Sequence, residues 1–332
     1  MRSRRTLTAW LLAALLPTVM ISVARAGTPS SPIATPAVLA SLIEKAMTTN
    51  LLTATVRAQV LAIDVRNPLR SAGLPLAPQQ RCFSSLDRTT LKNPKPCIFG
   101  NPRSTTTVVL FGSSAVDNWT PALQIAATRL GIRVATFQFE GCFTPFVSGL
   151  SADCTTFHNN LPRAISALHP KVIMAVASAD SAGESGDARY VSGMQRAFEA
   201  VGQLSPSARR VLWGTTPYMR APVPSCLMMR PRTVNTCGLT YVASSTVAHS
   251  YGQVLRRDVA AAERSNATLV PISSWFCSTT VCPAVIDNKI VYVDFLHVSA
   301  LYSRSLATLV TNQLQQLLTP GTPATAASAT AR

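Results

Sequence analysis

The stretch TTVVLFGSS, residues 106–114, decides the fold class, because a short apolar run meets a glycine and two serines there. β-Branched and aromatic side chains fill most of residues 106–111, which predicts a strand with both faces buried. Gly112 ends this strand, and the sequence after it predicts a helix over residues 118–130. A buried strand followed directly by a helix indicates a parallel sheet covered by helices.

The same alternation continues along the chain. Further strands are predicted at residues 132–139, 171–178, 209–215, 267–272 and 290–293. Further helices are predicted at residues 157–168, 189–204, 242–264 and 298–318. The pattern predicts a three-layer α/β/α domain with a mostly parallel central sheet of about five strands, as in flavodoxin-like folds.

The first 26 residues are typical of a secretory signal peptide. Met1–Arg5 is basic, Leu7–Val23 is apolar, and Ala24 and Ala26 are small residues at the positions that a signal peptidase recognises. We therefore expect cleavage after Ala26 and a mature protein that is secreted or periplasmic. An uncleaved N-terminal membrane anchor is the alternative, because the apolar stretch approaches the length of a membrane span.

The expected domain organisation is a signal peptide at 1–26, a linker with N-terminal helices at 27–80, an α/β domain at 81–318 and a disordered tail at 319–332. Apolar residues recur at helical spacing within residues 37–65. Residues 66–105 are rich in Pro, Ser and Asn, which predicts irregular structure ahead of the first strand. The tail has too few large apolar residues to pack against a core.

The chain has eight cysteines, an even number that indicates disulfides in an exported protein. Many pairings are possible, but sequential pairing is favoured, because each successive pair encloses one short, loop-like stretch. The predicted disulfides join Cys82 to Cys97, Cys142 to Cys154, Cys226 to Cys237 and Cys277 to Cys282. A zinc site is the alternative, but the sequence has no CxxC knuckle and no Cys/His cluster, so we expect no metal.

Composition and motifs argue against several classes of function. The formal net charge is +16, although only 13% of the residues are charged. The basic residues are scattered, without a run that interleaves aromatic residues, so we expect no nucleic-acid partner. No GxGxxG motif follows a predicted strand and no GxxxxGK[ST] motif occurs, so we expect no nucleotide cofactor, and nothing indicates another cofactor. A basic surface would suit anionic envelope polymers or lipid headgroups.

Two polar elements could carry chemistry. Ser114 follows the first predicted strand, and sites in parallel sheets form at the carboxyl ends of strands. Asp294 precedes His297 by three residues, a spacing at which a carboxylate can bond Nδ1–H and leave Nε2 to accept a serine proton. The alternatives are Asp117 or Ser114 as a helix cap, and Asp294 as a capping or turn residue with His297 as a surface or packed histidine. The other three histidines lie in or beside predicted helices, which makes His297 the best candidate for a base.

The segment TTVVLFGSSAVDNWTPAL, residues 106–123, resembles the first block of the SGNH hydrolases. It is most similar to the branch that is fused to, or associated with, membrane acyltransferases that O-acetylate surface glycans. The shared positions are Gly112, Ser114, Trp119, Pro121, Ala122 and Leu123. Residues 277–306 resemble the last block of the family, in which a cysteine pair and a short strand precede Asp-x-x-His.

This resemblance implies a role for each candidate residue. Ser114 would be the nucleophile, His297 the general base and Asp294 the carboxylate that orients the base. The backbone N–H of Ser114 would contribute to an oxyanion hole, with Gly141 and Ser178 as further candidates.

Two departures from the family pattern flank the candidate nucleophile: Ser113 stands where Asp is usual, and Ala115 stands where His is usual. Two functions therefore remain open. The first is an exported serine esterase or O-acyltransferase that acts on acyl esters, in particular acetyl esters, of cell-envelope glycans or glycolipids. The second is a catalytically degenerate module that binds such a glycan or a partner acyltransferase. In either case we expect a monomer.

Overall fold

The computed structural model describes residues 33–63, 91–176, 186–241 and 251–319. The predicted signal peptide, the predicted tail beyond residue 319, Cys82 and Ser178 lie outside these ranges. None of the described helices combines the length and the apolar content that crossing a membrane requires.

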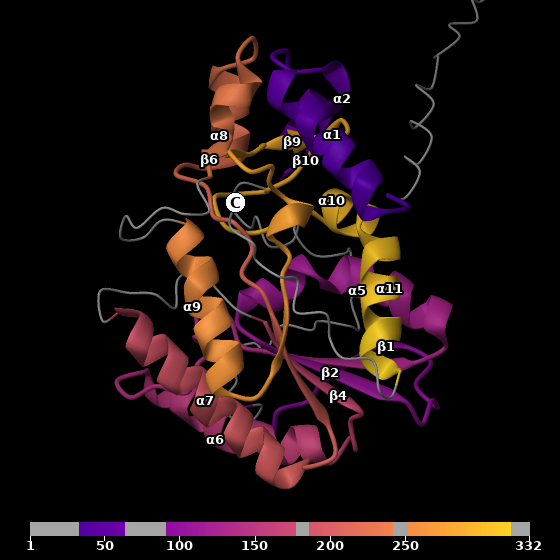
Figure 1. Ribbon diagram of the computed structural model, residues 1–332, viewed down its shortest axis with the longest axis vertical. Helices are drawn as coiled ribbons and strands as arrows, with labels where there is room; N and C mark the ends of the chain where they lie inside the picture. The colour runs from indigo at the N-terminus through magenta and orange to yellow at the C-terminus, as the bar shows by residue number, and fades with distance from the viewer. Residues whose placement is uncertain (1–32, 64–90, 177–185, 242–250, 320–332) are drawn as a thin grey trace, which may run out of the picture. The chain divides into compact units, whose positions relative to one another are not determined.

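The main sheet of the described residues has six strands in the order β1-β3-β2-β4-β5-β7 (Figure 1). Their bounds are β1 Cys97–Gly100, β2 Thr107–Gly112, β3 Arg133–Gln138, β4 Val172–Val176, β5 Arg209–Trp213 and β7 Thr268–Val270. All neighbouring pairs are parallel except β1 and β3. The predicted α/β class with a mostly parallel sheet is therefore confirmed, with six strands in place of about five.

Strand β1 corrects the expectation that residues 66–105 are irregular throughout. It pairs antiparallel with β3 in the register Cys97↔Thr136 to Gly100↔Arg133. Only four residues form it, too few for a periodic pattern, and its partner lies more than 30 residues further along the chain. An edge strand of this kind is specified by its partner and not by its own sequence.

Helices cover both faces of the sheet (Figure 1). The helices on one face are α5 Thr120–Leu130, α10 Ala300–Ser305 and α11 Ala307–Leu318, and those on the other are α6 Ala152–Ser166, α7 Gly186–Leu204 and α9 Tyr251–Arg264. Each face of the sheet has its own hydrophobic core, and side chains of β2 lie in both. Val108 and Leu110 pack with the first group of helices, and Val109 and Phe111 pack with the second. This alternation explains why β2 is apolar at every central position.

Local signals set several helix ends. The Ser151 hydroxyl accepts a hydrogen bond from the N–H of Cys154, which starts α6 earlier than residue 157, where the helix was expected. Gly131 ends α5 in the left-handed conformation at φ 64°. The helix expected over residues 298–318 is divided at Leu306 into α10 and α11, and Ser299 caps α10.

Two N-terminal helices, α1 Pro36–Thr48 and α2 Ala54–Leu61, lie beside a hairpin of β9 Val285–Ile286 and β10 Lys289–Ile290 (Figure 1). Gln59 joins α2 to this hairpin, because its side chain donates to the Asn288 carbonyl oxygen at 2.8 Å and accepts from the Ile290 N–H at 2.9 Å. Leu39 of α1 and Val56 of α2 belong to the same hydrophobic core as the buried residues of α5, α10 and α11.

The hairpin corrects the expectation of a strand at 290–293. Only Lys289–Ile290 is a strand, and it pairs with β9 outside the main sheet. Asp287 and Asn288 turn the chain with φ of 49° and 55°, the left-handed values that a tight hairpin turn requires. The remaining short elements are η1 Ser114–Asn118, α8 Val223–Met229, η3 Val234–Cys237, β6 Leu239–Thr240, η4 Ser273–Trp275 and β8 Val281–Cys282.

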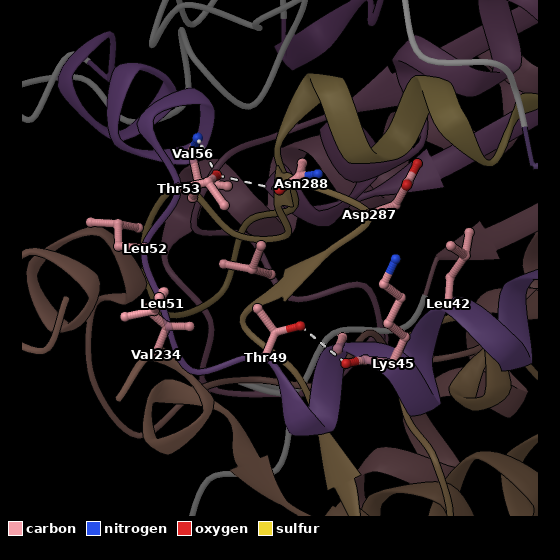
Figure 2. Close-up of a pocket in the computed structure, with 12 residues that line it drawn as sticks. Leu42, Lys45, Thr49, Leu51, Leu52, Thr53, Val56, Val234, Asp287 and Asn288 are labelled. Carbon is pink, nitrogen blue, oxygen red and sulfur yellow. Dashed lines mark hydrogen bonds between the residues drawn. The ribbon is translucent and has the colours of Figure 1, made fainter. Parts of the chain in front are cut away.

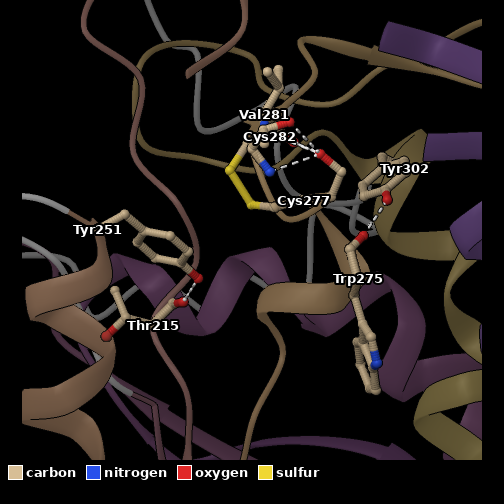
Figure 3. Close-up of a disulfide and its surroundings, with 9 residues drawn as sticks. Thr215, Tyr251, Trp275, Cys277, Val281, Cys282 and Tyr302 are labelled. Atoms are coloured by element: carbon tan, nitrogen blue, oxygen red, sulfur yellow. Dashed lines mark hydrogen bonds between the residues drawn. A yellow bond between two sulfur atoms is a disulfide. The ribbon is translucent and has the colours of Figure 1, made fainter. Parts of the chain in front are cut away.

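Three of the predicted disulfides lie within the described residues: Cys142–Cys154, Cys226–Cys237 and Cys277–Cys282. Figure 3 shows the last of them, near the hydrogen bond that the Tyr302 hydroxyl donates to the Trp275 carbonyl oxygen. Cys97 is also disulfide-bonded, and Cys82, its predicted partner, lies outside the described residues.

One cluster has the residue types of a metal site. The sulfur atoms of Cys142 and Cys154 and a ring nitrogen of His158 lie within 4.8 Å of one another. Both sulfurs belong to a disulfide, so neither is the thiolate that zinc binds. The ring of His158 stacks on Phe146 at a centroid distance of 4.2 Å, and burial lowers the pKa of His158 to about 4. The cluster is therefore a packed, uncharged part of the fold at neutral pH.

Three tryptophans form one buried cluster next to the carboxyl end of β2. Trp119 lies edge-to-face against Trp213, with ring centroids 5.2 Å apart, and against Trp275 at 5.8 Å. Trp213 and Trp275 contact each other at 5.8 Å in the same manner. Edge-to-face contacts stabilise the fold beyond the burial of the rings alone, and they favour one relative orientation of the rings.

Candidate active site

Ser114 stands where the central strand β2 ends. Gly112, the last residue of β2, leaves little space for a side chain, because a Cβ there would lie 3.1 Å from Thr144 Oγ1 and 3.2 Å from the Val176 carbonyl oxygen. Ser113 then caps a short 3₁₀ helix, its hydroxyl accepting from the Ala115 N–H at 3.3 Å. Ser114 is the first residue of this helix, η1, which we call the Ser114 helix.

Asp294 and His297 form one compact loop. Asp294 Oδ2 lies 2.6 Å from His297 Nδ1, and Asp294 Oδ1 accepts the backbone N–H groups of Leu296 and His297, each at 2.6 Å. One carboxylate therefore fixes both the backbone and the ring of the histidine, as the three-residue spacing predicts. We call residues 294–298 the His297 loop.

The remaining ring nitrogen of His297 faces the serine. His297 Nε2 lies 2.9 Å from Ser114 Oγ, so an unbroken chain of hydrogen-bonding contacts joins Ser114, His297 and Asp294. The side chains of His297 and Asp294 are 12% and 18% exposed, which shelters them but leaves access to solvent. With Asp294 holding Nδ1–H, His297 Nε2 is free to accept the Ser114 proton.

The electrostatics keep Asp294 ionised. Burial raises the pKa of Asp294, but the hydrogen bonds from the His297 ring and from two backbone N–H groups outweigh it, so the pKa lies below its ordinary value. The carboxylate can therefore stabilise a positively charged His297 ring.

Neighbouring segments hold the His297 loop from outside. The N–H of Val223 donates to the Asp294 carbonyl oxygen at 3.1 Å, and the N–H of Met219 donates to the Phe295 carbonyl oxygen at 2.7 Å. Both donors lie on the segment that follows strand β5.

Asn118, the last residue of the Ser114 helix, also contacts the loop. Its Oδ1 accepts the N–H of Val298 at 2.8 Å, and its Nδ2 donates to Thr216 Oγ1 at 3.3 Å. The sequence analysis did not identify Asn118, because its partners lie 98 and 180 positions away and leave no local pattern.

Two further carboxyl groups lie near the histidine. Burial raises the pKa of Asp117 to about 7, the charge of Glu140 adds to this, and a hydrogen bond from Gln138 Nε2, at 3.2 Å, acts against it. Partial burial likewise raises the pKa of Glu140, and the charge of His297 opposes the shift. From the sequence, Asp117 was a candidate only for a helix cap and Glu140 was not a candidate at all, because a lone carboxylate carries no local pattern.

Two of the three predicted oxyanion donors, Ser114 and Gly141, lie within the described residues. The backbone N–H groups of Ser114 and Gly141 have no acceptor among the described residues. Gly141 is exposed, with φ of 70°, and the N–H of Phe139 donates to the Gly112 carbonyl oxygen at 3.1 Å, so this segment runs beside the end of β2. Ser178 lies outside the described residues.

A separate cavity of about 210 Å³ lies between α1, α2, η3 and the β9–β10 hairpin (Figure 2). Leu42, Leu52 and Val234 form part of its apolar wall, while Lys45 and Asp287 add charge. None of the three candidate catalytic residues lines this cavity.

Solved structures share this fold. The periplasmic domain of a lipopolysaccharide acetyltransferase from Salmonella ser. Paratyphi A is similar, with a TM-score of 0.55 and 15% identity over 70% of this chain and 91% of that chain. Est24, a carbohydrate acetylesterase from Sinorhizobium meliloti, has a TM-score of 0.44 and 14% identity over 64% of this chain and 99% of that chain. At these identities the likeness concerns the fold alone, and the Salmonella domain supports it.

No curated protein matches the chain. The family comparison is more extensive, because residues 81–312 match the SGNH domain that is fused to AT3 domains. This range holds the whole main sheet, the Ser114 helix and the His297 loop. The chain therefore belongs to the SGNH family, in the group whose members are fused to AT3 domains.

Proposed function

We propose that this protein is an extracytoplasmic serine esterase or O-acyltransferase, which acts on acetyl or other acyl esters of cell-envelope glycans or glycolipids. One observation carries the proposal: Ser114 Oγ, the His297 ring and the Asp294 carboxylate lie in a continuous hydrogen-bonding chain of 2.9 Å and 2.6 Å. Membership of the SGNH family supports the reaction class, since hydrolases of this family cleave esters.

In this mechanism, Ser114 Oγ attacks the carbonyl carbon of the ester while His297 Nε2 takes the hydroxyl proton. The N–H groups of Ser114 and Gly141 donate hydrogen bonds to the oxyanion that forms. The intermediate collapses to an acyl-serine, and the protonated His297 returns the proton to the departing sugar oxygen. Water or a second sugar hydroxyl then attacks the acyl-serine, with His297 as base, and releases free acid or an acylated sugar.

Location and partner belong to the same proposal. The basic and apolar N-terminal sequence and the disulfides support export, and the Salmonella relative is named as a periplasmic domain. The AT3 fusion in the family supports a membrane acyltransferase as a partner that supplies or receives acyl groups.

One observation favours a degenerate binding module as the second candidate. Ser113 holds the Ser114 helix through a neutral 3.3 Å hydrogen bond, where a carboxylate would make a stronger, charge-assisted one. A loosely held serine reacts slowly, because nucleophiles need accurate placement.

The test uses the oxidised, purified full chain with p-nitrophenyl acetate and a fluorophosphonate probe. The proposal expects ester turnover and covalent labelling in the wild type, loss of both in Ser114→Ala, and no change in Ser192→Ala. Ser192 is a matched control because its hydroxyl bonds only the Arg189 carbonyl oxygen on α7. Absence of labelling in a folded wild type would refute the enzyme and favour the binding module.

Adding an acceptor sugar separates the two reactions that the proposal allows. Free acetate as the only product indicates an esterase, whereas acetylated sugar in the product indicates transfer.

A further inference from the structure

Asn118 connects the two halves of the candidate site. It ends the same short helix that Ser114 begins, and its side chain is 1% exposed. Each end of its carboxamide bonds a different segment: Val298 on the His297 loop and Thr216 on the segment after β5. The partners are also buried, so water cannot replace these bonds at low cost.

We propose that Asn118 is a positioning residue, which sets the distance between Ser114 Oγ and His297 Nε2 by holding the His297 loop against the Ser114 helix. The inference rests on the proposed function and adds to it a residue outside the triad. Asn118 does not touch the reacting atoms, and it acts through the backbone of the base.

The geometry explains why one bond can have this effect. Val298 follows His297 directly, so its N–H belongs to the peptide group that closes the backbone of the histidine. Asp294 fixes the preceding side, through the N–H groups of Leu296 and His297. With Asn118 in place, hydrogen bonds restrain the backbone on both sides of the ring. Without it, the loop keeps its backbone hydrogen bonds to Met219, Val223 and Val293 but loses the bond that ties its backbone directly to the Ser114 helix.

The Ser114 helix has few other restraints of this kind. Its N-terminal cap is the single neutral bond of Ser113. Asp117 bonds Gln138 on β3, which ties the helix to the sheet but not to the His297 loop. Among the described residues, Asn118 is the side chain of this helix that accepts a hydrogen bond from the backbone of that loop.

The test compares three variants by kcat and KM for p-nitrophenyl acetate. Asn118→Leu keeps the size and removes both bonds, Thr216→Val removes the Thr216 acceptor only, and Asn118→Asp keeps an oxygen acceptor for Val298.

Misplacement by about 1 Å costs on the order of 10²-fold in rate. We expect such a loss of kcat in Asn118→Leu with KM changed less than threefold, and a clear recovery in Asn118→Asp. Asn160→Leu, which removes a hydrogen bond within α6, should leave kcat unchanged.

Three readouts separate this role from a structural one. The proposal expects that hydrogen exchange at the Val298 amide is faster in Asn118→Leu, while the melting temperature shows that the variant is folded at the assay temperature. Unchanged kcat in a folded Asn118→Leu, with an active wild type, would overturn the inference. If Asn118→Leu does not fold, Thr216→Val decides: loss of the acceptor that holds the carboxamide should lower kcat, and a kcat equal to that of the wild type would overturn the inference too. An inactive wild type would instead refute the proposed function.

Discussion

Ser114 Oγ lies 2.9 Å from His297 Nε2, although 183 positions separate the two residues in the sequence. The serine is held by the end of β2, and the histidine by a loop near the C-terminal helices. The contact therefore exists only after the sheet, the β9–β10 hairpin and α10 have assembled. Substitutions that loosen these elements should act on the site from a distance.

Replacing Asp294 by Asn tests the orientation of the base. The amide cannot stabilise a charged His297 ring, and it can favour the wrong tautomer, so kcat should fall by on the order of 10³–10⁴-fold. The measurement is turnover of p-nitrophenyl acetate by enzyme whose folded fraction is checked by circular dichroism. A loss below tenfold would mean that Asp294 does not orient the base.

Asp117 makes the stability depend on pH in a defined direction. Its pKa is about 7 in the folded chain, against an ordinary value of 3.8, so the unfolded chain loses this proton first. Its contribution to stability is complete below about pH 4 and is lost as the pH rises through about 7. Asp117→Asn cannot ionise, so at pH 8 it should exceed the wild type in free energy of unfolding by roughly 2–4 kcal/mol.

The measurement for Asp117 is urea unfolding of both proteins from pH 4 to pH 8. His158 acts in the opposite sense, since its lowered pKa removes stability as the pH falls from about 6.5 towards 4. This contribution is common to both proteins and cancels in their difference. A difference that stays constant with pH would show that Asp117 is ionised throughout.

The central part of the fold was predictable because its signals are local. Strand β2 is an almost continuous apolar run next to a helix, and such a run specifies a buried parallel strand without reference to its partners. Strand β1 was not predictable, since four residues carry no period and its partner β3 lies more than 30 residues further along the chain. The hairpin turn at Asp287 was missed because Asp-Asn is a weaker turn signal than Asn-Gly.

In the candidate site, too, the contacts that local sequence patterns predict differ from those that only long-range packing sets. The spacing of Asp294 and His297 is a local pattern, and the structure brings both residues together with Ser114. The contacts of Asn118 and Asp117 depend on which segments fold against the Ser114 helix. Only long-range packing decides this, so no motif in a single sequence could have indicated it.

Phe295 should contact the substrate. Phe295 is 46% exposed and lies two residues before His297 in the His297 loop. If the ring covers part of a bound ester, Phe295→Ala should raise KM by on the order of tenfold, because a lost apolar contact costs about 1–2 kcal/mol. The change in kcat should be small.

The matched control for Phe295 is Leu204→Ala. Leu204 is also 46% exposed, at the end of α7, so its truncation should not alter KM. Equal KM values for both variants and the wild type would exclude Phe295 from the binding surface.

Loop length predicts the order in which the disulfides matter. Cys142–Cys154 spans 12 positions and Cys277–Cys282 spans 5. By loop-closure entropy, replacing the first pair with Ala should cost about 3 kcal/mol and the second about 2 kcal/mol. Urea unfolding of the two double variants measures both values. The reverse order would mean that contacts in the folded state, and not the unfolded chain, dominate the effect.

The tryptophan cluster gives the protein a built-in optical reporter. Three of its four tryptophans are Trp119, Trp213 and Trp275, and Trp119 directly follows the Ser114 helix. Closely packed indoles share excitation, so near-ultraviolet circular dichroism and intrinsic emission are sensitive to the geometry of the whole cluster. Formation and decay of the proposed acyl-serine should thus be measurable in real time without a label.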